Sequence, residues 1–183
     1  MLKLSDNPEI LYPPYTEVAS IPGTWWVGHT KSRCEKAFAN DLAAKEIAYF
    51  LPMVEQVTFS GGRKRRGMMP LFAGYVFFAG DEQVRYQALL TDRLCGVIAP
   101  PVQTQLVKEL AALHQVIASG ATIDPYPFAA VGRRCRVARG AFEGVEGTIV
   151  RRENAAPRLV LQVSMLGQGA SVEIEAGMLE PLD

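Results

Sequence analysis

An almost uninterrupted apolar and aromatic run, Leu71-Phe72-Ala73-Gly74-Tyr75-Val76-Phe77-Phe78, closely follows a dense basic stretch, Arg63-Lys64-Arg65-Arg66-Gly67. A second β-prone segment, 47–59, precedes the turn residues Ser60-Gly61-Gly62. Two β-prone segments separated by a polar segment with glycines are typical of a hairpin. We therefore predict a strand over 47–59, a basic loop at 63–67 and a second strand over 71–78.

Further short elements lie on both sides of this hairpin. Ser32 with Glu35 three residues later is a capping-box pattern, which predicts the start of a helix. Apolar residues at helical spacing predict two more helices. In chain order we expect a strand at 25–30, a helix at 32–45, a helix at 81–90, a brief strand at 97–98 and a helix at 102–117.

The composition divides the chain into four segments. Residues 1–23 carry prolines at a spacing that resists regular structure, so we expect a flexible leader. Residues 24–118 hold the alternating strands and helices, and 119–130 contain Gly and Pro without periodicity, which predicts a linker. From 131 to 183 short β-prone segments alternate with glycine-containing turns, which predicts a small antiparallel β-barrel domain. The fold class is therefore α+β.

Charge and hydropathy narrow the function. Lysine plus arginine and aspartate plus glutamate each total 19, so the formal net charge is zero. A protein that neutralises many phosphates is usually basic overall, so any contact with nucleic acid must come from a local patch. No apolar run approaches the roughly 20 residues of a membrane helix, and residues 1–16 lack a signal-peptide pattern. We expect a cytoplasmic protein with no membrane partner.

The reactive side chains form no recognisable centre in the sequence. The three cysteines, Cys34, Cys95 and Cys135, are widely spaced and include no CxxC pair, which argues against a disulfide framework and a zinc site. Neither His29 nor His114 has an acid, serine or cysteine at a telling distance. We predict no catalytic residue, no metal and no cofactor, and therefore not an enzyme.

Three strings follow one another at a distinctive spacing. The first is Trp25-Trp26-Val27 with Lys31-Ser32-Arg33-Cys34-Glu35-Lys36, the second is Pro70-Leu71-Phe72-Ala73-Gly74-Tyr75-Val76-Phe77, and the third runs from Gly132 to Val150. They resemble, respectively, the opening strand and helix of NusG-type N-terminal domains, the Phe-Pro-Gly-Tyr-Val strand of that family, and the KOW motif. The basic start of the first helix looks more like specialised paralogues of the RfaH type than like housekeeping NusG.

The resemblance implies a fold and a function. The fold would be a NusG-type N-terminal αβ-sandwich domain followed by a small SH3-like antiparallel β-barrel, the KOW domain. The function would be that of a transcription elongation and antitermination regulator. Its N-terminal domain would bind the clamp of bacterial RNA polymerase and suppress pausing, and its KOW domain would recruit a partner. We expect a monomer.

The polymerase-binding residues that the resemblance implies are mostly aromatic. In the family an apolar cavity grips a coiled coil of the polymerase clamp, which is recognition of a helix by aromatic anchors in a groove. A kink near Ala73-Gly74 would let Phe72 and Tyr75 project outward together. The alternative is that these side chains belong to the core. The candidates are Trp25, Trp26, Leu71, Phe72 and Tyr75.

Two basic groups are candidates for nucleic-acid binding. Phosphate contacts from lysine and arginine supply affinity without reading sequence, and the implied ligand is the non-template DNA strand or upstream DNA. The alternative is that both groups are solvated charge runs. The candidates are Lys31, Arg33 and Lys36 at the start of the first helix, and Arg63, Lys64, Arg65 and Arg66 in the hairpin.

The barrel has its own candidate site. Glycines at 140, 144 and 147 fit tight turns around Phe142. By the resemblance, Met165, Leu166 and Gln168 lie in a loop that binds a small-subunit ribosomal protein or Rho. This chain lacks the family's aromatic residue at 166 and basic residue at 168, which weakens the case for Rho more than for the ribosome.

Two other functions are alternatives to the role in transcription elongation. One is a KOW-type RNA-binding or ribosome-associated protein without a polymerase role, which the arginines of the barrel would serve. The other is a cysteine hydrolase that uses Cys34, although no base partner is evident.

Glycines and Pro157 would interrupt helices in the barrel segment, so we predict that this segment does not refold to helix.

Overall fold

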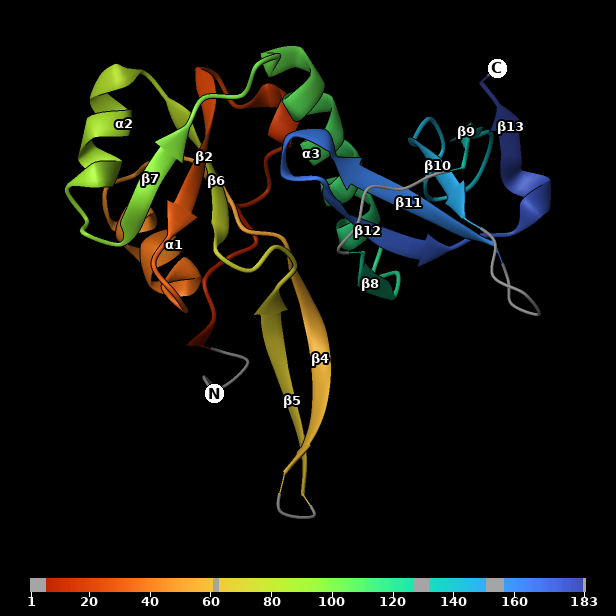
Figure 1. Ribbon diagram of the computed structural model, residues 1–183, viewed down its shortest axis with the longest axis horizontal. Helices are drawn as coiled ribbons and strands as arrows, with labels where there is room; N and C mark the ends of the chain where they lie inside the picture. The colour runs from red at the N-terminus through yellow and green to blue at the C-terminus, as the bar shows by residue number, and fades with distance from the viewer. Residues whose placement is uncertain (1–5, 61–62, 127–131, 151–156, 183) are drawn as a thin grey trace. The chain divides into compact units, whose positions relative to one another are not determined.

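The computed structural model describes residues 6–60, 63–126, 132–150 and 157–182. The chain divides into two compact units, Met1–Pro101 and Val102–Asp183. Figure 1 shows the elements of each unit. The first unit combines helices with an antiparallel sheet, and the second combines one helix with a second antiparallel sheet, so the predicted α+β class is confirmed.

The first unit is built on a five-stranded antiparallel sheet in the order β1-β3-β6-β2-β7. The strands are β1 (Leu11–Tyr12), β2 (Thr24–Thr30), β3 (Tyr49–Phe50), β6 (Tyr75–Gly80) and β7 (Leu94–Ile98). Strand β2 pairs with the whole length of β6, from Thr24 opposite Gly80 to His29 opposite Tyr75. The two Trp residues of β2 therefore lie on opposite faces, because successive strand residues alternate.

Two helices contribute to the core on one face of this sheet. They are α1 (Glu35–Ala44) and α2 (Glu82–Leu89). Phe38 of α1 and Ala88 of α2 belong to one buried cluster with Trp26 and Phe78. Phe38 meets Phe78 edge to face, with 5.9 Å between ring centroids, a favoured geometry for an aromatic pair. Helix α2 begins at Asp81, whose carboxylate accepts a hydrogen bond from the backbone N–H of Val84.

A separate two-stranded hairpin leaves the first unit (Figure 1). It consists of β4 (Met53–Ser60) and β5 (Arg63–Pro70), paired from Met53 opposite Pro70 to Ser60 opposite Arg63. The hairpin prediction is confirmed, but the basic stretch 63–67 is strand rather than loop. Lysine and arginine are common in exposed edge strands, so a run of basic residues does not by itself indicate a loop. The predicted turn residues Gly61 and Gly62 lie outside the described residues.

The N-terminal segment differs from the flexible leader expected. Within residues 6–23, β1 pairs with β3 and a short 3₁₀ turn covers Val18–Ser20. Leu11, Val18 and Ile21 are at most 9% exposed. The prolines do prevent long regular elements, yet the apolar residues between them bury their side chains, and burial favours order. Residues 1–5 lie outside the described part.

The second unit holds α3 (Gln103–Ala118) and a six-stranded antiparallel sheet in the order β13-β9-β10-β11-β12-β8. The strands are β8 (Ile123–Tyr126), β9 (Arg133–Val137), β10 (Glu146–Val150), β11 (Arg158–Val163), β12 (Gln168–Glu173) and β13 (Leu179–Pro181). Leu106, Leu110 and Leu113 of α3 are buried, as their spacing predicts.

The unit boundary falls at a different place from the sequence prediction. The sequence suggested a first domain of 24–118, a linker of 119–130 and a barrel of 131–183. In the structure α3 lies in the same compact unit as the six-stranded sheet and packs against β11. Part of the expected linker is a strand, because β8 pairs with β12, and residues 127–131 lie outside the described part.

Candidate functional site

Trp25 and Trp26 are both buried, at 1% and 9% exposure. Trp26 lies on the helix-covered face, where its indole N–H donates to the Gly80 carbonyl at 3.2 Å and the Arg85 guanidinium lies 5.6 Å from its ring centroid. Trp25 lies on the opposite face of β2. The two residues divide between the faces as alternation predicts, and neither presents a free ring to solvent.

The turn before β6 folds its apolar residues inward. The backbone kink expected near Ala73-Gly74 is present, since Gly74 has φ +84°, a left-handed conformation that glycine adopts readily. Leu71 and Phe72 are only 5% and 1% exposed. The ring of Phe72 meets Phe77 edge to face at 6.0 Å. The kink therefore turns Phe72 into the core rather than outward.

Tyr75 is the one polymerase-binding candidate that is not buried. It is half-buried and stacks on the exposed His29, with ring centroids 5.2 Å apart and an interplanar angle of 23°. The two residues are direct partners across β2 and β6, which explains the stacking. Tyr75 is therefore the accessible residue of the predicted site, and His29, which was not predicted to belong to it, stacks on its ring.

The start of α1 also differs from expectation. The helix begins at Glu35 with Cys34 at the N-cap, and no side chain caps it, so the predicted Ser32 capping box is wrong. The Glu35 carboxylate is instead 8% exposed and accepts a hydrogen bond from the backbone N–H of Gly74 at 2.6 Å. Glu35 therefore binds the backbone of Gly74, although the sequence pattern had assigned its carboxylate to the N-terminus of the helix.

The basic candidates differ in how free they are. Lys31 pairs with Asp92 at 2.7 Å, and Arg66 lies 3.5 Å from Glu55, both at exposed positions. Arg33 is exposed. Lys36 is half-buried and donates to protein acceptors, as detailed below. The backbone of Arg63, Lys64 and Arg65 lies in β5, but their side chains lie outside the described part.

An exposed apolar surface on α2 and β7 was not predicted as a site. Tyr86, Leu89 and Leu90 are 58%, 38% and 56% exposed, and they follow the i, i+3, i+4 spacing of one helix face. Ile98 on the edge strand β7 is 42% exposed, and α2 packs on β7. Adjacent exposed apolar residues indicate a contact surface more strongly than scattered ones. The helical spacing at 86–90 was the signal available in the sequence.

The candidate residues of the second unit lie in two loops. Phe142 precedes β10, and Met165 and Leu166 lie in a 3₁₀ turn between β11 and β12, where Gly167 has φ +62°. All three are half-buried, as is Gln168 at the start of β12. They are thus partly accessible, in contrast to Phe72.

Helix α3 runs along both of these loops. Glu109 accepts hydrogen bonds from the hydroxyl and backbone N–H of Ser164, at 2.6 and 3.1 Å. Gln115 donates to the carbonyls of Ala141 and Glu143, at 3.3 and 3.4 Å. Residues 109 and 115 are about 9 Å apart along a helix axis, so the two loops lie within one short distance of each other along α3.

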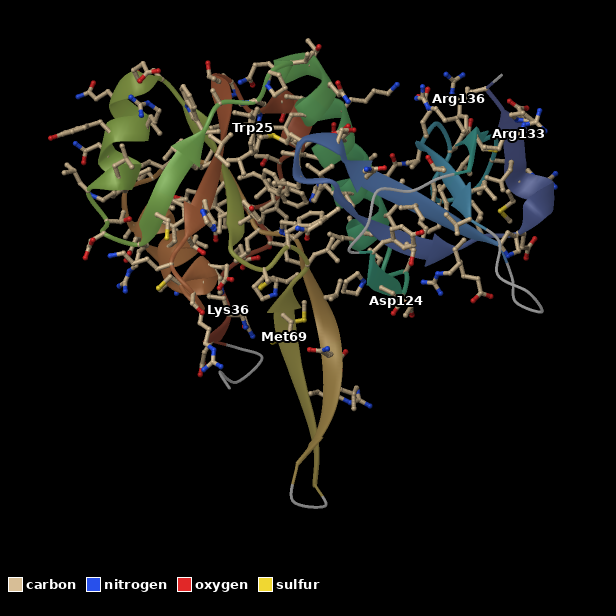
Figure 2. The ribbon with its side chains drawn as sticks, viewed as in Figure 1. Trp25, Lys36, Met69, Asp124, Arg133 and Arg136 are labelled. Atoms are coloured by element: carbon tan, nitrogen blue, oxygen red, sulfur yellow. The ribbon has the colours of Figure 1, made fainter. Side chains whose placement is uncertain are left out.

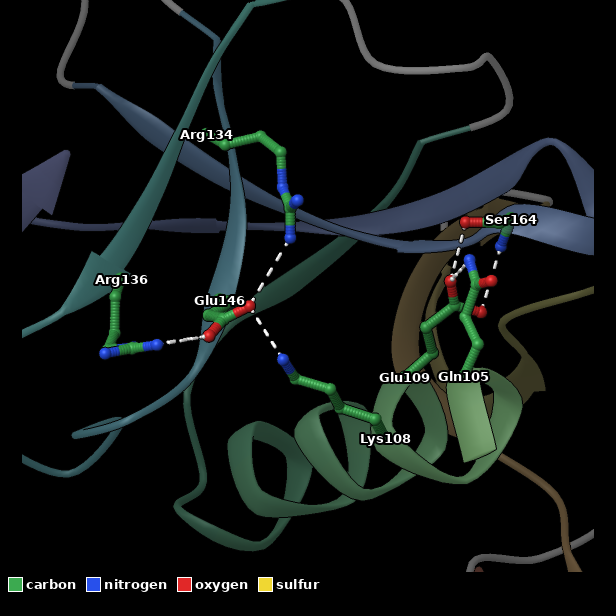
Figure 3. A network of polar contacts seen from close by, with 7 residues as sticks. All are labelled: Gln105, Lys108, Glu109, Arg134, Arg136, Glu146 and Ser164. Carbon is green, nitrogen blue, oxygen red and sulfur yellow. Dashed lines mark hydrogen bonds and ion pairs between the residues drawn. The ribbon is translucent and has the colours of Figure 1, made fainter. Parts of the chain in front are cut away.

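Three cations surround Glu146 on the same side of the second unit (Figure 3). Its carboxylate pairs with Lys108 of α3 at 2.8 Å, Arg136 at 2.7 Å and Arg134 at 3.4 Å. Hydrogen bonds from Lys108 and Arg136 lower the pKa of Glu146 to about 2. Two of the arginines that made the barrel look like an RNA-binding surface are therefore engaged by an acid. The sequence held no signal for this network.

Within the described residues, no group of three or more His, Cys, Asp or Glu side chains is arranged to hold a metal ion. Cys34 is half-buried at the N-cap of α1. No described helix has the length and apolar character needed to cross a membrane.

Figure 2 shows that the labelled Lys36 and Met69 lie toward the side of the first unit from which the hairpin leaves.

Comparison with known proteins identifies a family. A family model described as "Transcription termination factor nusG" matches residues 23–120. The transcription termination/antitermination proteins NusG of Vibrio vulnificus and Vibrio parahaemolyticus are each 27% identical over 139 residues, which cover 73% of this chain and 76% of theirs. A solved structure described as "Domain interaction in Thermotoga maritima NusG" covers 87% of this chain and 97% of its own, with a TM-score of 0.45 and 16% identity.

The family match spans more than half of the 183 residues and includes four of the five strands of the first sheet (β2, β3, β6 and β7), the hairpin and the helices α1, α2 and α3. The resemblance inferred from the three strings is thus confirmed at the level of the family, while closeness to the RfaH type stays a prediction. The chain belongs to the NusG family of transcription termination and antitermination factors.

Proposed function

We propose that the chain binds bacterial RNA polymerase at its clamp through the first unit and suppresses pausing. Family membership supports a role in transcription. The single surface observation that carries the proposal is the stacked pair of His29 and Tyr75, which join across the paired strands β2 and β6 and remain accessible. Rigid aromatic anchors lose little conformational entropy on binding and recur at the centres of protein interfaces.

The physical basis of pause suppression would be selective binding. A factor shifts the equilibrium between open and closed clamp states only by binding one of them more tightly. A contact of the first unit with the clamp, together with contacts of the basic hairpin with DNA phosphates, would favour the closed state. The single-residue contributions would be unequal, because Lys31 and Arg66 already lie near acids whereas Arg33 is exposed.

The second unit would recruit a further partner through Phe142, Met165, Leu166 and Gln168. The support is their partial exposure in two loops that α3 holds close together. A small-subunit ribosomal protein is the partner we favour, and Rho is the other outcome of a binding test. In either case one chain would connect the recruited partner to the polymerase, and such a connection raises the effective concentration of the partner near the polymerase.

The alternative is a KOW-type RNA-binding or ribosome-associated protein without a polymerase role. The exposed arginines of β9 would favour it, but Glu146 engages Arg134 and Arg136. Cations held by a carboxylate are less available to phosphates. The alternative also leaves the His29–Tyr75 surface without a purpose.

Retention by immobilised core RNA polymerase tests the proposal. Tyr75→Ala removes the exposed anchor, and Tyr15→Ala is a matched control because Tyr15 is a fully exposed tyrosine of the same unit. We expect wild type and Tyr15→Ala to bind, and Tyr75→Ala to bind at least about tenfold more weakly, as loss of an interface anchor requires.

The other outcomes are informative. If Tyr75→Ala binds like wild type whereas Leu90→Ser does not, the polymerase contact lies on the α2 surface and the anchor assignment is wrong. If the wild-type chain itself is not retained, the proposed polymerase function is wrong. RNA binding by the second unit is then the hypothesis to test.

A further inference from the structure

Two adjacent side chains at the start of α1 bind both ends of the segment Met68–Gly74, which comprises the last residues of β5 and the turn that leads to β6. The Glu35 carboxylate accepts the backbone N–H of Gly74 at 2.6 Å. The Lys36 ammonium donates to the backbone carbonyl of Met68 at 2.6 Å, and also to the side-chain oxygen of Asn7 at 2.6 Å. One helical turn therefore brackets the place where the hairpin leaves the sheet.

The hairpin depends on such contacts for its direction. Among the described strands, β4 and β5 pair only with each other and form a sheet of their own. An isolated two-stranded ribbon is marginally stable in water, so its orientation relative to the five-stranded sheet is fixed at its base. The base contacts include the buried Met53 and the hydrogen bond from the Leu71 N–H to the Pro52 carbonyl, at 2.8 Å.

The environment of Lys36 suits a structural role. Two of the three ammonium donors have protein acceptors, which leaves at most one for an outside ligand. Burial lowers the pKa of Lys36, and the adjacent Glu35 carboxylate opposes this effect. Arg33, three residues earlier, is exposed.

We propose that Glu35 and Lys36 are positioning residues that fix the direction of the β4–β5 hairpin, and that Lys36 serves nucleic-acid binding through the hairpin rather than by touching a phosphate. Only the second half of this statement rests on the proposed function. Loss of either contact frees one end of Met68–Gly74, so the basic residues of β5 are no longer presented in one orientation. The resemblance assigned Lys36 the same direct role as Arg33, and the structure separates the two.

The first experiment measures the bracket itself and needs no ligand. Lys36→Met keeps a side chain of similar length but removes the donor and the charge, while Arg33→Met removes one charge from an exposed site nearby. Hydrogen exchange of the full-length chain is followed at the amides of β4, β5 and Gly74. We expect these amides to exchange at least about tenfold faster in Lys36→Met than in wild type, because loss of the Lys36 hydrogen bonds increases local opening. In Arg33→Met we expect no increase in the exchange rate.

A second variant guards against a folding defect. Lys36→Gln keeps a hydrogen-bond donor without the charge, so it should retain part of the protection even if Lys36→Met folds poorly. Equal exchange in Lys36→Met and Arg33→Met, with both folded by circular dichroism, would overturn the positioning role whatever the chain binds.

The second experiment separates positioning from phosphate contact. Binding to a DNA duplex with a central unpaired stretch is measured for Lys36→Met, for a hairpin variant in which residues 63–66 are all changed to Gln, and for all five changes together. If Lys36 acts through the hairpin, its change has no further effect once the hairpin cations are gone, which is a strongly non-additive cycle. An undiminished loss in the combined variant would show a direct phosphate contact and would contradict this part of the proposal.

If the wild-type chain does not bind the DNA at all, the nucleic-acid role of the hairpin is wrong. The exchange experiment then still decides whether Lys36 holds the hairpin. The two halves of the proposal can therefore fail separately.

Discussion

Replacement of Phe72 by Ala should destabilise the first unit strongly. The side chain is 1% exposed, and its ring packs edge to face on Phe77 with 6.0 Å between centroids. A buried Phe removes roughly 150 Å² of apolar surface from water, worth about 4 kcal/mol at about 25 cal/mol per Å². The aromatic pair contributes about 0.5–1.5 kcal/mol more, partly offset because Ala keeps some of the burial. We therefore expect a loss of about 3–5 kcal/mol, the range found for Phe→Ala in cores.

The assay is urea unfolding followed by tryptophan fluorescence, because Trp25 and Trp26 are both in the first unit and both buried. Phe72→Leu is the companion variant, since a smaller change of volume should cost about 1.5 kcal/mol or less and keep the chain folded. Tyr75→Ala, at a half-buried position, should cost clearly less than Phe72→Ala. A loss below about 1 kcal/mol for Phe72→Ala would refute the view that Phe72 is a core residue.

This prediction also decides which variants can test polymerase binding. A residue whose removal costs several kcal/mol affects binding through folding, so loss of binding in Phe72→Ala would say little about an interface. Tyr75 is the better probe because its ring is accessible. The sequence alone could not separate the two, since both are aromatic residues of one apolar run.

Three further predictions use unfolding in urea as the readout. Asp81→Ala removes the side-chain cap of α2 and should cost about 1 kcal/mol, and an unchanged midpoint would contradict the cap. Gly147→Ala should cost about 1–3 kcal/mol because the added Cβ would lie 2.6 Å from the Val160 carbonyl, whereas Gly96→Ala, with no atom within 4 Å, should be nearly neutral, so equal costs would refute the packing argument. The Glu146 network should stabilise the chain above the carboxyl's ordinary pKa of 4.5 and lose that contribution as the pH falls toward about 2, because its folded-state pKa is lowered. Its partners are largely exposed, so the effect should be on the order of 1 kcal/mol, and a Glu146→Gln variant should lack this pH dependence.

The parts of the fold that the sequence predicted best are those with strong periodicity. Leu106, Leu110 and Leu113 mark the buried face of α3, and the short apolar β2 carries its two Trp residues on opposite faces. Both patterns depend only on local geometry, which repeats every 3.6 or 2 residues. Family membership was predicted from three strings, and the first two lie within the residues that the family model matches.

The parts that it missed depend on contacts between distant residues. Phe72 was expected to face outward, yet the turn at Gly74 directs it onto Phe77. Glu35 has the spacing of a cap but binds Gly74, which is 39 residues away. Lys108 and Glu146 are 38 residues apart and form an ion pair that the local sequence around either residue does not indicate. Side chains with several available partners take the one that the tertiary fold supplies, and local pattern does not contain that information.

The most direct test of the central claim is the lifetime of a paused elongation complex. Purified core RNA polymerase is halted at a defined pause site on a DNA template, and escape is timed with and without the full-length chain, with Tyr75→Ala as the matched variant. We expect that the wild-type chain shortens the pause and that Tyr75→Ala loses most of this effect at equal concentration. An unchanged pause lifetime at saturating wild-type protein would contradict the claim that this chain acts on transcript elongation.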